Sequence, residues 1–152
     1  MPRSIIQAVV LFAALLFCTS PTPAAESGTV RLATFRCDAT PPLEGKFYGG
    51  WGQPLTRLED PLWAKGIVLD QGHERYVICA IDWCVLCNSS HRLFCEKLAA
   101  AAGTDVSRVA VQSVHQHTAP SADGDEERLV RKATGSHGHT DIEWLDTLAD
   151  RL

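Results

Sequence analysis

The sequence predicts an α/β fold built on a mixed sheet that contains a β-hairpin and a strand-helix-strand crossover. Two apolar runs rich in β-branched residues, Trp63 to Leu69 and Arg75 to Asp82, flank a short polar turn, as in a hairpin. A segment with helix-capping residues follows and runs through Ala102, and the apolar run Val106 to Val114 comes after it. Strand, helix and strand in this order are typical of a crossover between parallel strands.

The segment before the hairpin predicts one strand and one long loop. Thr29 to Arg36 alternates apolar and polar residues, which favours a first strand, and Pro41 and Pro42 end it because proline has no backbone N–H to donate. Leu43 to Leu58 is rich in glycine and shows no period. Long loops of this kind in a compact domain are usually functional or wrap over the core.

Helix signals follow the hairpin. Asn88-Ser89-Ser90 offers caps for a helix through Ala102, and Gly103 closes it. Ser121 to His139 carries charges of both signs and predicts a loop with one helical turn.

A last helix is predicted at the end of the chain. Thr140-Asp141-Ile142-Glu143 is a capping box that begins this helix. The chain stops at Leu152 without a cap, which indicates an incomplete portion of a larger domain.

The amino terminus has the order of a secretory signal. Arg3 precedes the apolar run Ile5 to Phe17, and Pro21 to Ala25 ends in small residues. We therefore expect a signal peptide over residues 1–25, one partial domain over 26–152, and a secreted or periplasmic protein. No later run approaches the roughly 20 apolar residues of a membrane span, so the mature chain is expected to lack one.

Charge and cysteine content argue against two classes of protein, nucleic-acid-binding proteins and disulfide-rich scaffolds. The net charge of −4 comes without a basic cluster that could neutralise phosphates, so nucleic acid is not an expected partner. Of six cysteines, Cys18 lies in the signal, and the remaining odd number leaves at least one thiol unpaired, buried or bonded to another chain. A dense disulfide scaffold is therefore not expected.

Candidate chemistry lies at the end of the last predicted strand. His115 and His117 stand at i and i+2, so in a strand both rings leave one face and can converge on a metal ion or a substrate carbonyl. The alternative is a pair of histidines that only form hydrogen bonds there. Asp82 ends the strand that is expected to lie parallel to this last strand, so it should reach the same edge of the sheet as His115. There it either orients a histidine or forms a turn.

Two further patterns compete with this pair. Cys84 and Cys87 follow a strand and precede a helix, as in a thioredoxin-like thiol oxidoreductase. The proline- and glycine-rich loop before Trp63 does not suit that fold, so we favour core cysteines or one local disulfide. His137 and His139 repeat the i, i+2 spacing within a polar loop, and they can supply a third ligand only if that loop folds back.

Four short segments occur in the order found in one enzyme family. They are Cys37-Asp38-Ala39-Thr40-Pro41-Pro42 with Gly49-Gly50-Trp51, Asp60-Pro61-Leu62-Trp63-Ala64-Lys65, Ala80-Ile81-Asp82, and Val114-His115-Gln116-His117-Thr118-Ala119-Pro120. Over about Thr29 to Pro120 the chain resembles the amino-terminal part of the neutral, non-lysosomal ceramidases.

The resemblance implies zinc-dependent hydrolysis of the amide of N-acylsphingosine-type lipids, the expected lipid partner. His115 matches the histidine that binds zinc in the family, and His117 matches the second motif histidine, which assists catalysis beside the metal. Val114 and Gln116 replace the two motif threonines. The other family ligands, a histidine, a glutamate and a tyrosine, would lie beyond Leu152. Catalytic zinc normally needs three protein ligands, so a non-catalytic truncated remnant is the third hypothesis.

Overall fold

The computed structural model describes residues 28–43, 46–50 and 52–152. The expected signal segment, 1–25, lies outside these residues, and so does Trp51. Within the described part of the chain, every helix is too short or too polar to cross a membrane.

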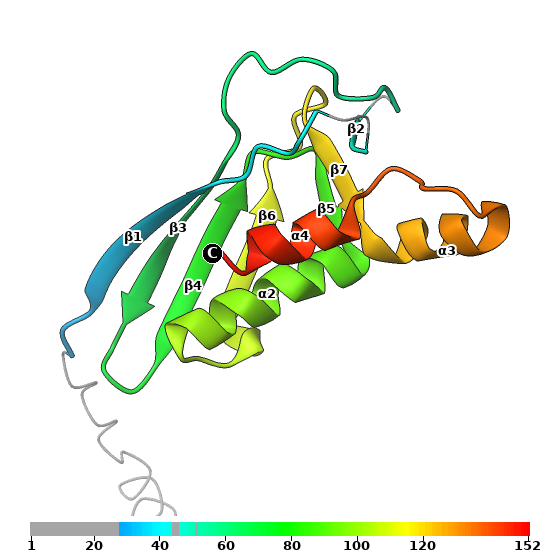
Figure 1. Cartoon of the computed structure of the whole chain (residues 1–152). Helices are drawn as coiled ribbons and strands as arrows, with labels where there is room; N and C mark the ends of the chain where they lie inside the picture. Colours follow the sequence, from blue (N-terminus) through cyan, green and yellow to red (C-terminus); the bar gives the residue numbers. More distant parts are fainter. Residues whose placement is uncertain (1–27, 44–45, 51) are drawn as a thin grey trace, which may run out of the picture.

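A four-stranded mixed sheet forms the centre of the fold (Figure 1). Its strands, in sheet order, are β1 (Arg31–Asp38), β3 (Trp63–Asp70), β4 (Arg75–Ile81) and β6 (Val109–Ser113). The pairs β1–β3 and β3–β4 are antiparallel, whereas β4 and β6 are parallel, with Ile81 opposite Ser113. The predicted mixed sheet, its hairpin and its parallel crossover are therefore confirmed.

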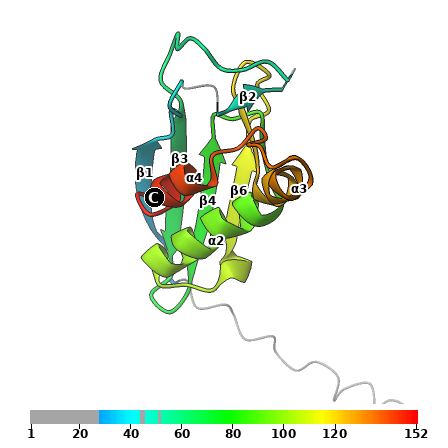
Figure 2. The same cartoon turned by 45° about the vertical axis from the view of Figure 1, so that its right-hand side comes forward.

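Helix α2 (Asn88–Ala102) makes the crossover and lies against one face of the sheet (Figure 2). Gly103 ends it with φ 62°, the left-handed conformation that glycine adopts without strain, as predicted. The predicted caps are wrong, because Cys87 is the N-cap residue and contributes no side-chain hydrogen bond. The side-chain NH₂ group of Asn88 instead donates to the Asp123 carboxylate at 2.5 Å. A short 3-10 turn, η1 (Val106–Arg108), leads into β6.

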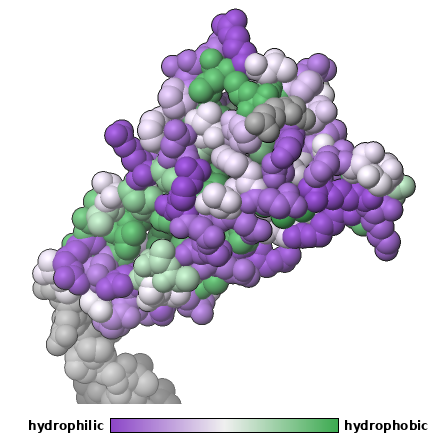
Figure 3. Space-filling model, in the orientation of Figure 1, coloured by the Kyte–Doolittle hydropathy of each residue, from purple (hydrophilic) through white to green (hydrophobic). Residues whose placement is uncertain are grey.

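The predicted loop from Ser121 to His139 is wrong, because this segment contains strand β7 (Pro120–Asp123) and helix α3 (Gly124–Thr134). The Asp123 carboxylate caps α3 by accepting hydrogen bonds from two backbone N–H groups in the first turn. Acidic side chains occupy that first turn and basic ones the last turn, which complements the helix dipole. Figure 3 shows the arm formed by α3, at the right, as largely hydrophilic. The many charged residues of this segment, which led to the prediction of a loop, therefore belong to an exposed helix.

Strand β7 is the centre of a second, three-stranded sheet that the sequence did not predict. It pairs antiparallel with β2 (Tyr48–Gly49) and parallel with β5 (Val85–Cys87). Strands of two to four residues carry too little periodicity to be recognised in a sequence. This small sheet joins the glycine-rich loop to the segment that follows β4.

Helix α4 (Ile142–Ala149) occurs where the last helix was predicted, but its cap differs. Asp141 is the N-cap and accepts a hydrogen bond from the Trp144 backbone N–H at 3.0 Å. The hydroxyl of Thr140, the expected cap, accepts instead from the backbone N–H of Asp123 at 3.2 Å. Thr140 therefore links the two helical segments rather than starting the helix.

Aromatic side chains between the sheet and the helices fix the segment after β4. Trp83 is fully buried, and its ring lies 5.9 Å from Phe94 and 6.1 Å from Trp144, measured between ring centroids. Its indole N–H donates to the Ala39 carbonyl at 3.0 Å. The next residue, Cys84, is therefore held in place by the core.

The helices cover one face of the four-stranded sheet, and the other face is exposed to solvent. Val77 and Ile81 of β4 point toward the helices and are buried, whereas Ile78 between them is 45% exposed. Leu32 of β1 is also exposed, at 62%. The outer face therefore presents apolar side chains to solvent.

Candidate metal centre

The candidate site forms where strands β4 and β6 end side by side. Beyond the paired residues Ile81 and Ser113, the two segments stay connected. The backbone N–H of Val114 donates to the Ile81 carbonyl at 3.1 Å, and that of His115 donates to the Trp83 carbonyl at 2.9 Å. The crossover thus brings the segment after β4 against the segment that carries both histidines, as the parallel arrangement predicted.

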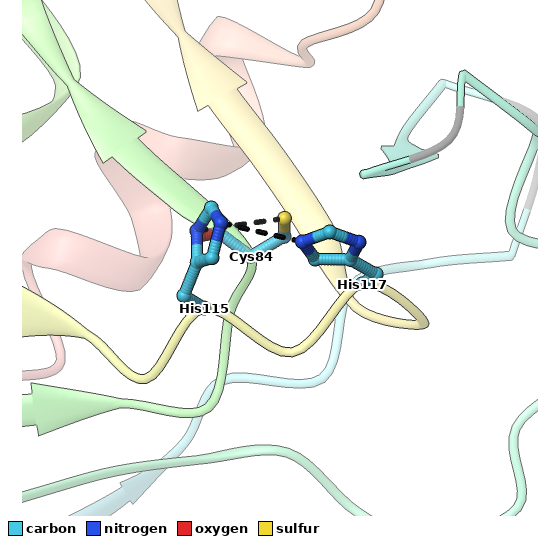
Figure 4. A group of neighbouring side chains, drawn as sticks. All are labelled: Cys84, His115 and His117. Carbon is cyan, nitrogen blue, oxygen red and sulfur yellow. Dashed lines mark hydrogen bonds between the residues drawn. The ribbon is translucent and has the colours of Figure 1, made fainter.

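His115 and His117 lie in a loop and not in a strand, because β6 ends at Ser113. His115 adopts φ 65°, a left-handed conformation that costs a non-glycine residue roughly 1–3 kcal/mol. The prediction that both histidines lie in a strand is therefore wrong. The rings nevertheless converge: their Nε2 atoms are 3.3 Å apart, and the ring planes meet at 86° (Figure 4).

A third donor joins the two imidazoles. The thiol of Cys84 lies 4.0 Å from His115 Nδ1, and one donor atom from each of the three side chains lies within 4.8 Å of the others. Cys84 is 2% exposed, whereas His115 is exposed and His117 half-buried. Figure 4 shows the three side chains pointing toward one another. We call this set the Cys84–His115–His117 group.

The backbone carbonyl of Cys84 sets the tautomer of His115. His115 Nδ1 lies 2.8 Å from this carbonyl oxygen, and since a carbonyl can only accept, Nδ1 carries the proton. The lone pair of Nε2 then faces the group. Metal-binding histidines commonly donate their other ring N–H to a carbonyl in this way, which fixes ring orientation.

Gly50, from the glycine-rich loop, closes over the group. Its backbone N–H donates to the His117 carbonyl at 3.0 Å. A Cβ atom at position 50 would lie 2.6 Å from the Cys84 sulfur and 3.3 Å from the His117 ring. Only glycine leaves room there for both side chains. The glycine-rich loop, expected to be functional or to wrap over the core, therefore borders the histidines.

The donor types of the group fit a metal ion. A thiolate and two imidazoles are ligands that zinc uses, and donors on a tetrahedral zinc ion lie about 3.4 Å apart for two nitrogens. The 3.3 Å between the two Nε2 atoms matches that separation. The group can hold a metal ion, and these distances do not select which metal.

Asp82 does not orient a histidine. Its carboxylate accepts a hydrogen bond from the Trp63 backbone N–H at 3.0 Å, and its own N–H donates to the Trp63 carbonyl at 2.9 Å. Its backbone carbonyl accepts from the Gln116 side chain at 2.9 Å. Asp82 therefore has the structural role, which was the alternative interpretation, and it connects β3 to the histidine loop.

The two cysteines of the W-C-x-x-C pattern have different partners. Cys84 faces His115, whereas the Cys87 thiol donates to the Asp123 carboxylate at 3.3 Å. Burial, followed by the hydrogen bond with Asp123, raises the pKa of Cys87 to about 11. A thioredoxin-like pair needs an activated thiol at the helix start, which this arrangement does not favour. All cysteines of the described residues are free thiols, so there is no local disulfide among them.

His137 and His139 do not join the group. His137 Nδ1 lies 3.6 Å from the buried Glu127 carboxylate, and the ring of His139 packs on Tyr48 at 4.3 Å between centroids. The third donor comes from Cys84 instead.

A cavity of about 570 Å³ adjoins the histidine loop. Gln116 and Thr118, the neighbours of His117, line one side together with Asp82. Four leucines line it as well: Leu43, Leu55, Leu58 and Leu62.

Comparisons with known proteins identify the fold. No protein-family model matches the sequence, and no curated protein matches it significantly. A solved structure described as a ceramidase complexed with C2 is similar, with a TM-score of 0.52 and 17% sequence identity. The match covers 80% of this chain and 20% of that chain, so the protein spans about a fifth of the length of this relative. At this identity the similarity shows that the chain shares its fold with part of that protein.

Proposed function

We propose that the chain is part of, or a short relative of, a zinc-dependent hydrolase that cleaves the amide bond of N-acylsphingosine-type lipids after export from the cytoplasm. The order of the sequence motifs and the ceramidase-like fold support this proposal. The observation that carries it is the convergence of the two motif histidines, with 3.3 Å between their Nε2 atoms beside a cavity lined in part by leucines.

His115 binds zinc through Nε2 in this proposal. Its Nδ1–H donates to the Cys84 carbonyl at 2.8 Å, which keeps the ring turned toward the metal position. When bound, zinc polarises the amide carbonyl and lowers the pKa of water to about 7, which makes water a nucleophile at neutral pH.

His117 is the proton-transfer group. Its Nε2 atom lies 3.3 Å from His115 Nε2, beside the metal position, and a neutral imidazole there can take a proton and pass it to the departing amine nitrogen. The Gly50 N–H holds the His117 backbone at 3.0 Å, so the ring stays close to the metal position.

The adjoining cavity suits the apolar part of such a substrate. Its leucines can cover a hydrocarbon chain, while the side chains of Gln116 and Thr118 offer polar atoms close to the amide.

The test is amide hydrolysis by the purified full-length chain supplied with zinc and a short-chain N-acylsphingosine. Released sphingosine is measured by mass spectrometry for the wild type, for His115→Ala and for His73→Ala, a matched control in the exposed β3–β4 turn. We expect hydrolysis in the wild type and the control and none in His115→Ala. Zinc-loaded wild-type protein without hydrolysis would refute a short hydrolase that is active by itself and would favour the non-catalytic remnant.

A further inference from the structure

We infer that Cys84 is a metal ligand and that the Cys84–His115–His117 group binds a zinc-like divalent cation without a donor from elsewhere. A cysteine ligand is not among those that the ceramidase resemblance implies. The inference rests on the proposed function only for the metal position that the two share. It concerns the protein without substrate, in which His117 takes no part in proton transfer.

The position of Cys84 favours a cation over a free thiolate. The side chain is 2% exposed, and a buried negative charge is stable only beside a positive partner. The described neighbours of its sulfur include the imidazole of His115, at 4.0 Å, and the Gly50 backbone. On metal binding the thiol releases its proton to solvent, and both histidines bind as neutral imidazoles.

A cysteine nucleophile activated by His115 is a poorer interpretation of the same contacts. The ring nitrogen nearest to the sulfur, Nδ1, already carries a proton because it donates to the Cys84 carbonyl at 2.8 Å. It cannot accept the thiol proton as a general base. The free lone pair of His115 lies at Nε2, which points toward His117.

The distances within the group are close to those of a three-ligand zinc site. Around tetrahedral zinc, a sulfur and a nitrogen lie about 3.6 Å apart and two nitrogens about 3.4 Å apart. The two Nε2 atoms are at 3.3 Å, and all three donors fall within 4.8 Å. Binding therefore requires the sulfur to move toward the two nitrogens, a side-chain movement. A fourth position stays open, as in catalytic zinc sites.

The surrounding backbone holds Cys84 in this place. Its N–H donates to the Pro120 carbonyl at 2.8 Å, and its carbonyl accepts from the Ser113 hydroxyl at 3.2 Å as well as from His115. The absence of a side chain at Gly50 leaves the space that the sulfur occupies. Since neighbours on three segments fix this residue, little ordering is needed when a metal binds.

The test is titration of the purified full-length chain with cobalt(II), a spectroscopic substitute for zinc. A cysteine ligand produces a thiolate-to-cobalt charge-transfer band in the near ultraviolet. We expect this band in the wild type and in Cys87→Ser, the matched control whose thiol bonds Asp123, and its loss in Cys84→Ser. Zinc affinity, measured by competition, should fall roughly tenfold or more in Cys84→Ser and in His117→Ala.

Alkylation of the wild type keeps the inference testable even if a variant fails to fold. Zinc should protect Cys84 from a thiol reagent, as mapped by mass spectrometry, and leave the half-buried Cys37 as reactive as before. A wild type without the band, a band that survives in Cys84→Ser, or unprotected Cys84 would overturn the inference. Cobalt bound through Cys84 without amide hydrolysis would refute only the proposed function, and amide hydrolysis by a wild type that shows no band would refute only the ligand assignment.

Discussion

The buried carboxylate of Glu127 in α3 is expected to be a large single contributor to stability. Its side chain is 0% exposed and accepts hydrogen bonds from Arg131 Nε at 2.6 Å and from the backbone N–H groups of Gly138 and Thr140, both at 3.1 Å. Burial raises the pKa of this group, but these hydrogen bonds outweigh it and hold the pKa below its usual value. Glu127 thus ties α3 to the loop that leads into α4.

Glu127→Gln is expected to lower the free energy of unfolding by about 3 kcal/mol. The amide keeps the volume and one oxygen, which can still accept from Arg131 and Gly138. Its NH₂ group faces the Thr140 N–H, so a buried donor loses its acceptor at a cost of about 1–3 kcal/mol, and the remaining hydrogen bonds lose their charge. For a domain of this size the melting temperature should fall by roughly 10 °C.

Thermal denaturation followed by circular dichroism measures this effect, with Glu143→Gln as the matched control. Glu143 also bonds Arg131, at 3.3 Å, but its side chain is 71% exposed, so its loss should change stability by no more than about 0.5 kcal/mol. Because the pKa of folded Glu127 is lowered, its contribution is present above the unfolded value of about 4.3 and disappears as the pH falls through the folded pKa. The difference between wild type and Glu127→Gln should therefore be constant near neutral pH and shrink as the pH falls below about 4.3 and through the lowered pKa of folded Glu127. Equal melting temperatures at neutral pH, or a difference that acid leaves unchanged, would refute this reasoning.

Three further predictions concern the site and the core. Gly50→Ala should weaken cobalt binding because its Cβ would lie 2.6 Å from the Cys84 sulfur, whereas Gly28→Ala, with open space around it, should leave the titration unchanged. Trp83→Phe should lower the free energy of unfolding by about 2 kcal/mol in urea denaturation, because the buried Ala39 carbonyl loses its indole donor; an unchanged midpoint would contradict the role of this bond. Zinc at about 100 times its dissociation constant should stabilise the wild type by about 2.7 kcal/mol, measured as a rise in melting temperature. Chelation should reverse that rise, and a rise of equal size in Cys84→Ser would count against the ligand assignment.

The elements with strong patterns were predictable from the sequence. The hairpin β3–β4 and the parallel strand β6 have long apolar runs, and α2 ends at a glycine with positive φ. Helix α3 was missed because its charged residues were taken for a loop. The order of those charges, acidic after Asp123 and basic before Gly135, is the signal that could have identified the helix.

The candidate site was predictable in its location but not in its geometry. A parallel crossover brings the ends of β4 and β6 to one edge, which predicts that residues after Ile81 meet residues after Ser113. That register also places Cys84 near His115 and could have identified the third donor, whereas the spacing between Cys84 and Cys87 is the pattern of a thiol pair. The left-handed conformation of His115 has no sequence signal, because it results from the hydrogen bond to the Trp83 carbonyl.

The apolar outer face of the four-stranded sheet governs how this protein behaves in a test tube. Leu32, Tyr76 and Ile78 are 62%, 40% and 45% exposed, and water contact with such surface costs about 25 cal/mol per Å². Concentrated samples should therefore self-associate and adsorb to detergent micelles, and sedimentation at several dilutions belongs before any binding stoichiometry is accepted.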